Sequence, residues 1–160
     1  MIKTVKAISY QDMKDYLDGR SNQAKFIADK HDSVWLISIT DPDVFPIVKL
    51  SPKSLPLQFH DADPGPLPIT NQKFRHIQFF DMHQARKIAN FIVNAQKSGE
   101  SNDILLVNCM AGISRSGAIA DTARALLSID YQEFKNLNPQ IIPNRWVKGL
   151  LFKAFEEILG

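Results

Sequence analysis

The sequence predicts one α/β domain over residues 1–160, with a central, mostly parallel sheet of four or five strands flanked by helices. Short β-branched apolar runs alternate with amphipathic stretches of helical period, which is the pattern of a layered α/β domain. The chain has 160 residues, the length of one ordinary domain. Its 44% hydrophobic and 22% charged residues are typical of a globular protein, and a chain of this length buries a core without disulfides.

The expected strands are short apolar runs bounded by turn residues. The run at 34–39 ends at an Asp-Pro pair, and the unbroken Ile-Leu-Leu-Val run at 104–107 is typical of a strand buried on both faces. Further short strands are predicted at 47–50 and 55–59. Prolines lie within or beside these two runs, so we expect them near an edge of the sheet, because proline cannot donate to a ladder.

Helical periodicity and capping residues predict six helices. The best defined follows Asp81, which forms a capping pair with Gln84, and it is expected to end at Ser98-Gly99. Its apolar residues recur at three- and four-residue intervals, as in a helix with one buried face. The predicted ranges are 10–18, 22–31, 82–97, 116–127, 131–137 and 144–159.

Charge and composition exclude several classes of function. The 19 Lys and Arg and the 17 Asp and Glu give a net charge of +2 spread along the chain, so no nucleic-acid partner is expected. No apolar run approaches the ~18 residues of a membrane helix, and the N-terminus has no signal-peptide core; we therefore expect a cytoplasmic protein with no membrane partner. The single cysteine and the four scattered histidines lack metal-ligand spacing, so neither a metal nor a cofactor is expected. The oligomeric state is not predicted.

The candidate chemistry lies directly after the 104–107 strand, where a short loop of small residues leads into a helix. This arrangement directs several backbone N–H groups, with the positive end of a helix dipole behind them, at one point. Such a nest binds a tetrahedral oxyanion, and Gly112 and Ala111 are expected to let the backbone approach it closely. The predicted substrate-binding residues are Met110, Ala111, Gly112, Ile113, Ser114 and Arg115.

Two side chains of this loop are candidate catalytic groups. Cys109 ends the strand beneath the nest, where a helix terminus and a neighbouring arginine favour the thiolate, the nucleophilic form. Arg115 follows six residues later and is expected to fold back over the loop and hold two phosphate oxygens in a bidentate fork, a geometry that lysine lacks.

Residues 109–117, CMAGISRSG, resemble the CxxGxSRS signature loop of the protein tyrosine phosphatase superfamily, in particular its dual-specificity branch with its compact bacterial and phage-type members. A looser similarity covers 59–63, 84–92 and 138–144. The resemblance implies a cysteine-phosphatase fold and a two-step, metal-free hydrolysis of a phosphorylated protein or peptide through a phosphocysteine. It also implies that Ser116 hydrogen-bonds the thiolate and stabilises sulfur as a leaving group.

The sequence departs from the family pattern directly before the cysteine, where Asn108 replaces the usual histidine. The resemblance assigns that histidine a part in orienting the loop and lowering the pKa of the thiol. Asparagine carries no charge, so we expect the pKa of Cys109 to lie above the family norm.

A general acid must protonate the leaving alcohol, and several aspartates compete for this role. Asp61 is preferred, because it follows a predicted strand and opens a loop over 60–73 whose three prolines and one glycine favour an irregular, functional segment. Asp63 in the same loop and Asp81 are the alternatives, although capping already explains Asp81. Asp41, in the sequence TDPD, is interpreted as a turn residue.

Other functions remain open at this point. The chain is alternatively a catalytically weak phosphate-binding module, or a phosphatase of RNA 5′-phosphates or another non-protein phosphate. Thioredoxin-linked arsenate reduction is disfavoured because Cys109 is the only cysteine, and an inositide phosphatase is disfavoured because Met110, Ala111 and Ile113 carry no charge. Asn144 is expected to cap the last helix.

Overall fold

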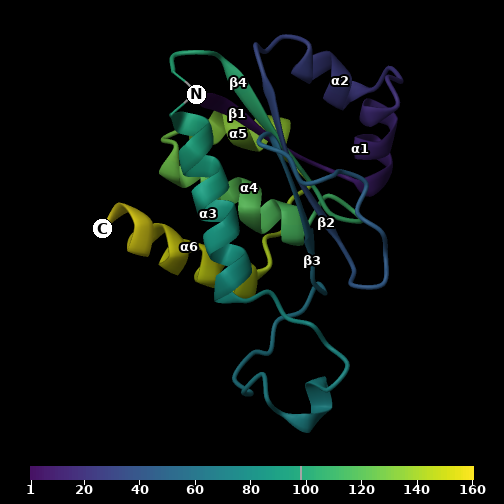
Figure 1. The fold of residues 1–160 in the computed structure, drawn as a ribbon, viewed down its shortest axis with the longest axis vertical. Coiled ribbons are helices and arrows are strands. Elements are labelled where there is room, and N and C mark those ends of the chain that lie inside the picture. Colours follow the sequence, from purple (N-terminus) through teal and green to yellow (C-terminus); the bar gives the residue numbers. More distant parts are fainter. Residues whose placement is uncertain (98) are drawn as a thin grey trace.

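The computed structural model describes residues 1–97 and 99–160, which form a four-stranded, fully parallel sheet in the order β1-β4-β2-β3 (Figure 1). The strands are β1 (Ile2–Ile8), β2 (Val34–Thr40), β3 (Ser54–Gln58) and β4 (Asp103–Asn108). The α-helices are α1 (Tyr10–Leu17), α2 (Gln23–Ala28), α3 (Met82–Gln96), α4 (Arg115–Leu126), α5 (Tyr131–Leu137) and α6 (Arg145–Leu159). A 3₁₀ turn, η1 (Gln72–Phe74), precedes α3.

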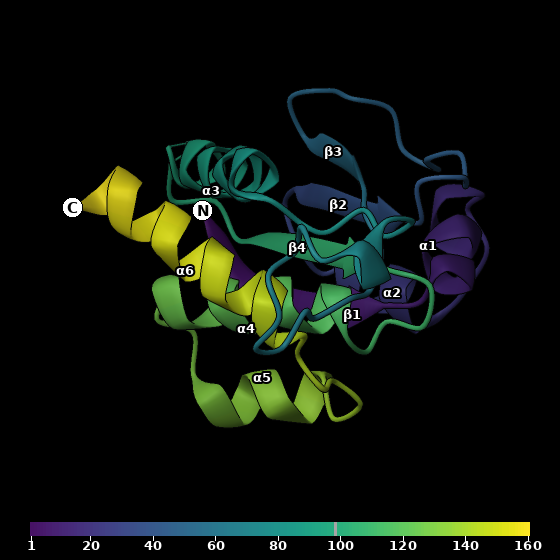
Figure 2. The same cartoon turned by 90° about the horizontal axis from the view of Figure 1, so that it is seen from below.

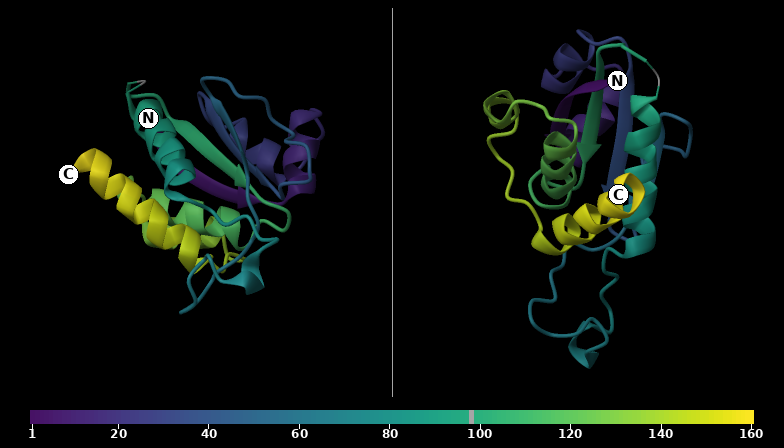
Figure 3. Two further views of the ribbon diagram at one scale, coloured as in Figure 1. Left: turned by 60° about the horizontal axis from the view of Figure 1, so that its bottom comes forward. Right: turned by 90° about the vertical axis from the view of Figure 1, so that its left-hand side faces the viewer.

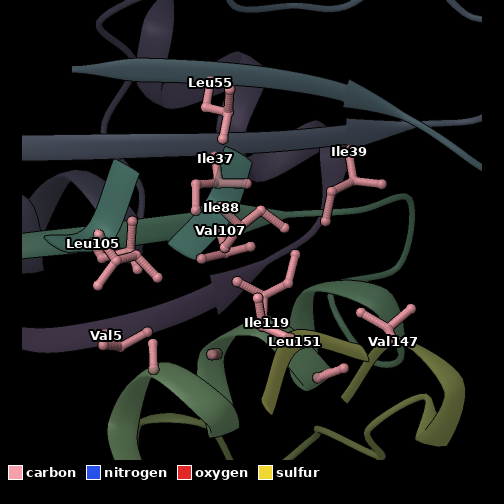
Figure 4. Close-up of a cluster of buried hydrophobic side chains, with 14 of the residues drawn as sticks. Val5, Ile37, Ile39, Leu55, Ile88, Leu105, Val107, Ile119, Val147 and Leu151 are labelled. Carbon is pink, nitrogen blue, oxygen red and sulfur yellow. The ribbon is translucent and has the colours of Figure 1, made fainter. Parts of the chain in front are cut away.

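Helices cover both faces of the sheet, α1 and α2 on one side and α3 to α6 on the other (Figures 2 and 3). On strand β4, Leu105 and Val107 belong to the larger core cluster with α3, α4 and α6, whereas Ile104 and Leu106 belong to the cluster beneath α1 and α2. Figure 4 shows part of the larger cluster, in which side chains of all four strands meet those of the three helices. Burial on both faces explains why β4 is an unbroken apolar run.

The predicted α/β class is confirmed, with four strands that are all parallel. The strand at 55–59 is confirmed as β3, which lies at an edge of the sheet, as its proline suggested. The strand predicted at 47–50 is wrong, because these residues lie in an irregular segment between Pro46 and Pro52. Its apolar content instead anchors the segment, since Val48 is buried in the smaller core cluster.

Strand β1 was not predicted from the sequence. Its Lys3 and Lys6 interrupt the apolar pattern, and a buried lysine is unusual in a strand. Lys6 is nevertheless buried, and its ammonium donates a hydrogen bond to the carbonyl of Leu137, the last residue of α5. A long-range contact therefore makes this strand possible.

The helix predictions hold in type and number among the described residues, with differences at the ends. Helix α2 ends at Ala28, three residues earlier than expected, and α4 begins at Arg115. The capping box of Asp81 and Gln84 is present at the start of α3. The predicted stop at Ser98 lies outside the described residues. In the described part of the chain, no helix combines the length and hydrophobicity needed to cross a bilayer.

Candidate active site

The signature loop, residues 109–115, joins the end of the central strand β4 to the first turn of α4. Neighbouring segments fix its carbonyl groups from outside. The carbonyls of Met110, Gly112, Ile113 and Ser114 accept hydrogen bonds from Tyr10 N–H (3.1 Å), Gln140 Nε2 (3.1 Å), Ile142 N–H (3.0 Å) and Asn144 N–H (3.1 Å), respectively. Because the C=O and N–H of a trans peptide point in opposite directions, the following N–H groups turn away from these neighbours and toward the inside of the loop.

The structure gives a packing reason for a glycine at position 112. Its φ of +74° lies in the left-handed region, and a Cβ on it would lie 2.5 Å from the carbonyl carbon of Ile8 and 2.7 Å from the nitrogen of Ser9. The glycine therefore lets the loop pack against the end of β1, on its outer side. The expectation that Gly112 also lets the backbone approach an anion closely stays a prediction.

Cys109 lies beneath the loop and is only 3% exposed. Its Sγ is 3.1 Å from the hydroxyl oxygen of Ser116. Burial by itself raises the pKa of the thiol, but hydrogen bonds from the Ser116 hydroxyl and from the backbone N–H groups of Ser116, Ile113 and Gly112 outweigh it, so the pKa of Cys109 is lowered. The sulfur thus occupies an environment that stabilises a thiolate.

The guanidinium of Arg115 is buried at the same edge of the sheet, with the residue 5% exposed. Its Nη1 donates to Asp41 Oδ1 (2.7 Å) and to the carbonyl of Phe59 (2.8 Å). Its Nε is buried and has no hydrogen-bond partner among the described residues. One end of the guanidinium is therefore held by the protein, while the Nε–H donor has no acceptor among the described residues.

Asp41 was interpreted from the sequence as a turn residue only, and its contact with Arg115 was not predicted. Its carbonyl does accept from Val44 N–H (3.0 Å), so the predicted turn is present, but its carboxylate pairs with Arg115. The sequence feature that could have predicted this contact is the position of Asp41 directly after β2. This strand is hydrogen-bonded to β4, and the carboxyl ends of parallel strands meet at one edge of the sheet.

The three aspartates that compete as general acid have different surroundings. Asp61 Oδ1 accepts from the hydroxyl of Ser114 (2.8 Å) and from Asn144 Nδ2 (2.8 Å), which brings this carboxyl to the signature loop. Asp63 accepts from Gly65 N–H (2.9 Å) within a local turn. Asp81 caps α3. Of the three, only the Asp61 carboxyl has a hydrogen bond to the signature loop among the contacts of the described residues.

Asn144 has two roles. It caps α6 as expected, since its Oδ1 accepts from Val147 N–H (3.0 Å). Its amide also donates to Asp61 and to the carbonyl of Ala62 (3.1 Å), so it links the start of α6 to the segment that carries the candidate acid.

Asn108, which replaces the family histidine, is fully buried behind the loop. Its amide donates to the carbonyl of Cys109 (3.3 Å), and its Oδ1 has no hydrogen-bond partner within the described residues. The side chain therefore steadies the backbone at the cysteine without bringing a charge to the sulfur.

The remaining predicted substrate-binding residues differ in their exposure to solvent. Met110 and Ala111 are exposed, while Ile113 and Ser114 are half-buried. The described residues contain no cluster of three side chains of the types that hold a metal ion.

Comparison with solved structures places this geometry in a known fold. Human DUSP28 superposes with a TM-score of 0.57 at 16% sequence identity, over 98% of this chain and 94% of that one. DUSP15 gives a TM-score of 0.54 at 19% identity, over 97% and 85% of the two chains. The chain has the dual-specificity phosphatase fold. A third structure with this fold, the human tyrosine phosphatase-like serine/threonine/tyrosine-interacting protein, gives a TM-score of 0.51 at 19% identity, over 86% and 87% of the two chains.

The resemblance seen in the signature loop is thus confirmed at the level of the dual-specificity phosphatase fold. No protein-family model matches the sequence, and no curated protein matches it either. At identities of 16–19% the likeness concerns the fold, so the activity has to be argued from the chemistry of the site.

Proposed function

We propose that the protein is a cysteine-dependent phosphate-monoester hydrolase, a protein-tyrosine or dual-specificity phosphatase that works through a phosphocysteine. One observation carries this proposal: the buried sulfur of Cys109 lies 3.1 Å from the Ser116 hydroxyl oxygen, at the start of a signature loop that leads directly to the buried Arg115. The Ser116 hydroxyl and the backbone N–H groups of the loop lower the pKa of this thiol. A thiolate, a nest of N–H groups and a guanidinium are the groups that phosphoryl transfer from a monoester requires.

In the first step, the Cys109 thiolate attacks phosphorus and the bond from phosphorus to the ester oxygen breaks. The loop N–H groups and Arg115 bind the phosphoryl oxygens and offset the charge that develops on them. Asp61 donates its proton to the leaving oxygen, so that the product leaves as a neutral alcohol or phenol. Both hydrogen bonds to Asp61 go to Oδ1, and we therefore assign the transferred proton to Oδ2.

In the second step, water attacks the phosphocysteine, the sulfur–phosphorus bond breaks, and inorganic phosphate leaves. The Asp61 carboxylate now accepts a proton from the attacking water. The Ser116 hydroxyl, 3.1 Å from Sγ, hydrogen-bonds the sulfur as it regains its negative charge. The thiolate and the protonated acid are then ready for the next cycle.

Asp41 and the Phe59 carbonyl act as positioning groups in this mechanism. Both accept hydrogen bonds from Nη1 of Arg115, which restricts the rotation of the guanidinium before substrate binds. A preorganised cation loses less conformational entropy when it binds the phosphate and therefore stabilises the transition state more effectively.

Residues 1–160 would serve as one catalytic domain, acting on phosphorylated proteins or peptides in the cytoplasm, where a catalytic thiol stays reduced. Support for a protein substrate comes from the loop side chains Met110, Ala111 and Ile113, which offer no cation for a second phosphate of an inositide.

The second candidate is a phosphate-binding module with little turnover. It is favoured by the uncharged Asn108 beside the cysteine, and by the name of the human neighbour, which describes a phosphatase-like interacting protein. The same fold thus accommodates proteins named for hydrolysis and a protein named for interaction.

Metal-free turnover of para-nitrophenyl phosphate separates the two candidates. We expect hydrolysis by the wild-type protein in the presence of a chelator, and loss of this activity to the background rate in Cys109→Ser, because the serine hydroxyl is a much weaker nucleophile than a thiolate. Undiminished activity in Cys109→Ser contradicts the mechanism, and phosphopeptide binding without turnover favours the binding module. A panel of phosphotyrosine, phosphoserine, phosphothreonine, inositide and RNA 5′-phosphate substrates then identifies the substrate class.

A further inference from the structure

A protruding loop, residues 61–77, extends beyond the edge of the sheet at which the signature loop lies (Figure 1). Its two ends meet at one point, since His60 N–H donates to the Gln78 carbonyl (2.8 Å) and Gln78 N–H donates to His60 Nδ1 (2.8 Å). Its first residue, Asp61, is hydrogen-bonded to Ser114 of the signature loop. The flanking residues of a polypeptide bound by its phosphate in the signature loop are therefore within reach of the base of this loop, because an extended chain advances about 3.3 Å per residue.

The protruding loop is built as a defined surface. Three prolines restrict its backbone, and side-chain-to-backbone turns form at Asp63 (to Gly65 N–H, 2.9 Å) and at Asn71 (to Lys73 N–H, 2.9 Å). Aromatic contacts connect it to the helical layer, because the Phe74 ring lies 5.2 Å from the Phe79 ring and Phe79 lies 6.1 Å from Trp146 at the start of α6. A preorganised surface of this kind loses little entropy when it binds a partner.

The outer part of this loop, residues 64–77, has a local charge of +2, whereas Asp61 and Asp63 lie at its base. It contains Lys73 and Arg75 and no acidic residue, whereas the whole chain has 19 Lys and Arg against 17 Asp and Glu. Both side chains are exposed, and the ion pairs of the described residues include neither of them. Two exposed cations with no ion-pair partner among the described residues thus lie on a loop whose base adjoins the site that we propose to act on anionic substrates.

Apolar side chains are exposed on the same outer part. Leu67 is 38% exposed, Ile69 48% and Ile77 38%. Together with the two cations, they form a surface complementary to a chain that carries both acidic and apolar residues.

We propose that the outer part of the protruding loop binds the polypeptide next to the phosphorylated residue and selects substrates whose flanking residues are acidic and apolar. This inference rests on the proposed phosphatase function and adds a substrate class to it. The cations attract the acidic flank, and the exposed Leu and Ile side chains contact its apolar residues.

A membrane surface is a weaker match for the same residues. Electrostatic binding to anionic lipid uses clusters of four to eight basic residues, each worth about 1 kcal/mol. The outer part of the protruding loop offers only Lys73 and Arg75. Two exposed cations suffice to bias the choice between peptides, because rim charges mainly change association rates.

The test compares phosphopeptides of one length and one phosphorylated residue, with Glu-and-Leu, Gln-and-Leu or Lys-and-Leu flanks on either side. We expect the wild-type protein to favour the acidic flank in kcat/KM. In the double variant Lys73→Glu/Arg75→Glu, the ratio of acidic to basic peptides should fall by roughly three- to tenfold, as expected for two exposed ion pairs. The preference should shrink in ~0.5 M salt, where charges are screened over a few ångströms.

The control variant Lys3→Glu/Lys153→Glu makes the same charge change on exposed positions of β1 and α6 and should leave the ratio unchanged. An equal fall in this control, or an unchanged ratio in Lys73→Glu/Arg75→Glu, overturns the proposal. Loss of binding to phosphatidylserine vesicles by the loop variant, with peptide selectivity unchanged, assigns the surface to a membrane and also overturns the proposal.

Absence of para-nitrophenyl phosphate turnover contradicts the phosphatase function instead of the flank preference. In that case the affinities of the same peptides, measured by fluorescence anisotropy, still test the flank preference.

Discussion

The signature loop and the protruding loop extend from the same edge of the sheet but are held in different ways. Four carbonyls of the signature loop accept hydrogen bonds from neighbouring segments, and its cysteine and arginine are buried. The outer part of the protruding loop is largely exposed and is attached to the body chiefly through its base and through ring contacts with Phe79. This difference agrees with the two roles that we propose. Chemistry needs fixed geometry, which the signature loop has, and selection of a substrate chain tolerates local adjustment, which the protruding loop allows.

Asp61 stands where the two loops meet, and its replacement should have the largest effect. We expect Asp61→Asn to lower kcat by roughly 10²–10⁴-fold, the usual contribution of a general acid. The fall of activity on the basic side of the pH profile should also flatten, because the amide has no proton to lose. Asp63→Asn, which alters only a turn of the protruding loop, is the matched control and should retain activity. If Asp63→Asn or Asp81→Asn shows the larger loss, the assignment of Asp61 is wrong.

Removing the charge of Asp41 tests whether Arg115 depends on support from the segment that follows β2. Asp41→Asn replaces a charged hydrogen bond of 2.7 Å with a neutral one. A hydrogen bond to a charged group contributes about 1.5–3 kcal/mol, which corresponds to roughly 10- to 150-fold in kcat/KM. Asp43→Asn, two residues further along the same segment and exposed, is the control. Equal kinetics of the two variants would show that the ion pair does not position the guanidinium.

Substituting two glycines with similar φ angles, one in each loop, compares how tightly the two loops are packed. Gly112 has a φ of +74° and Gly65 of the protruding loop a φ of +61°, so an alanine at either position is strained by about 1–3 kcal/mol. A Cβ at Gly112 also collides with the backbone of Ile8, whereas a Cβ at Gly65 meets nothing within 4 Å. Urea unfolding should therefore show a larger loss of unfolding free energy for Gly112→Ala than for Gly65→Ala. Equal losses would mean that the signature loop is no more tightly packed than the protruding one.

The smallest expected change is a shift in the pH midpoint of Cys109 alkylation, which tests the hydrogen bonds to the sulfur in the signature loop. Because hydrogen bonds outweigh burial and lower the pKa of Cys109, the midpoint of iodoacetamide alkylation should lie below that of a free thiol, with the rate rising through it as the pH increases. Ser116→Ala removes one of those hydrogen bonds and should move the midpoint to higher pH. Asn108→His should move it to lower pH, since an imidazolium favours the thiolate. A midpoint for Asn108→His above that of the wild type would contradict our interpretation of Asn108.

The sequence was sufficient to predict those elements whose pattern lies within one short segment of the chain. The alternation of apolar runs and helical stripes predicted β2, β3, β4 and the helices, and the single stretch 109–117 predicted the signature loop. The strand proposed at 47–50 failed because apolar residues also anchor irregular segments, as Val48 does. Strand β1 was missed because its buried lysine depends on a carbonyl more than 130 residues away.

By its own order of residues, this chain determines which side chain is the candidate nucleophile and which cation follows it. Cys109 and Arg115 are separated by a single short turn, so their spacing is a property of the covalent chain. Only the packed molecule decides what surrounds them: Asp41 and the Phe59 carbonyl on the guanidinium, and the 138–144 segment on the loop backbone. Those contacts depend on the strand order β1-β4-β2-β3, which brings the carboxyl ends of β2 and β4 together. Strand order is set by how all the buried faces pack at once, and no single segment of the sequence carries that information.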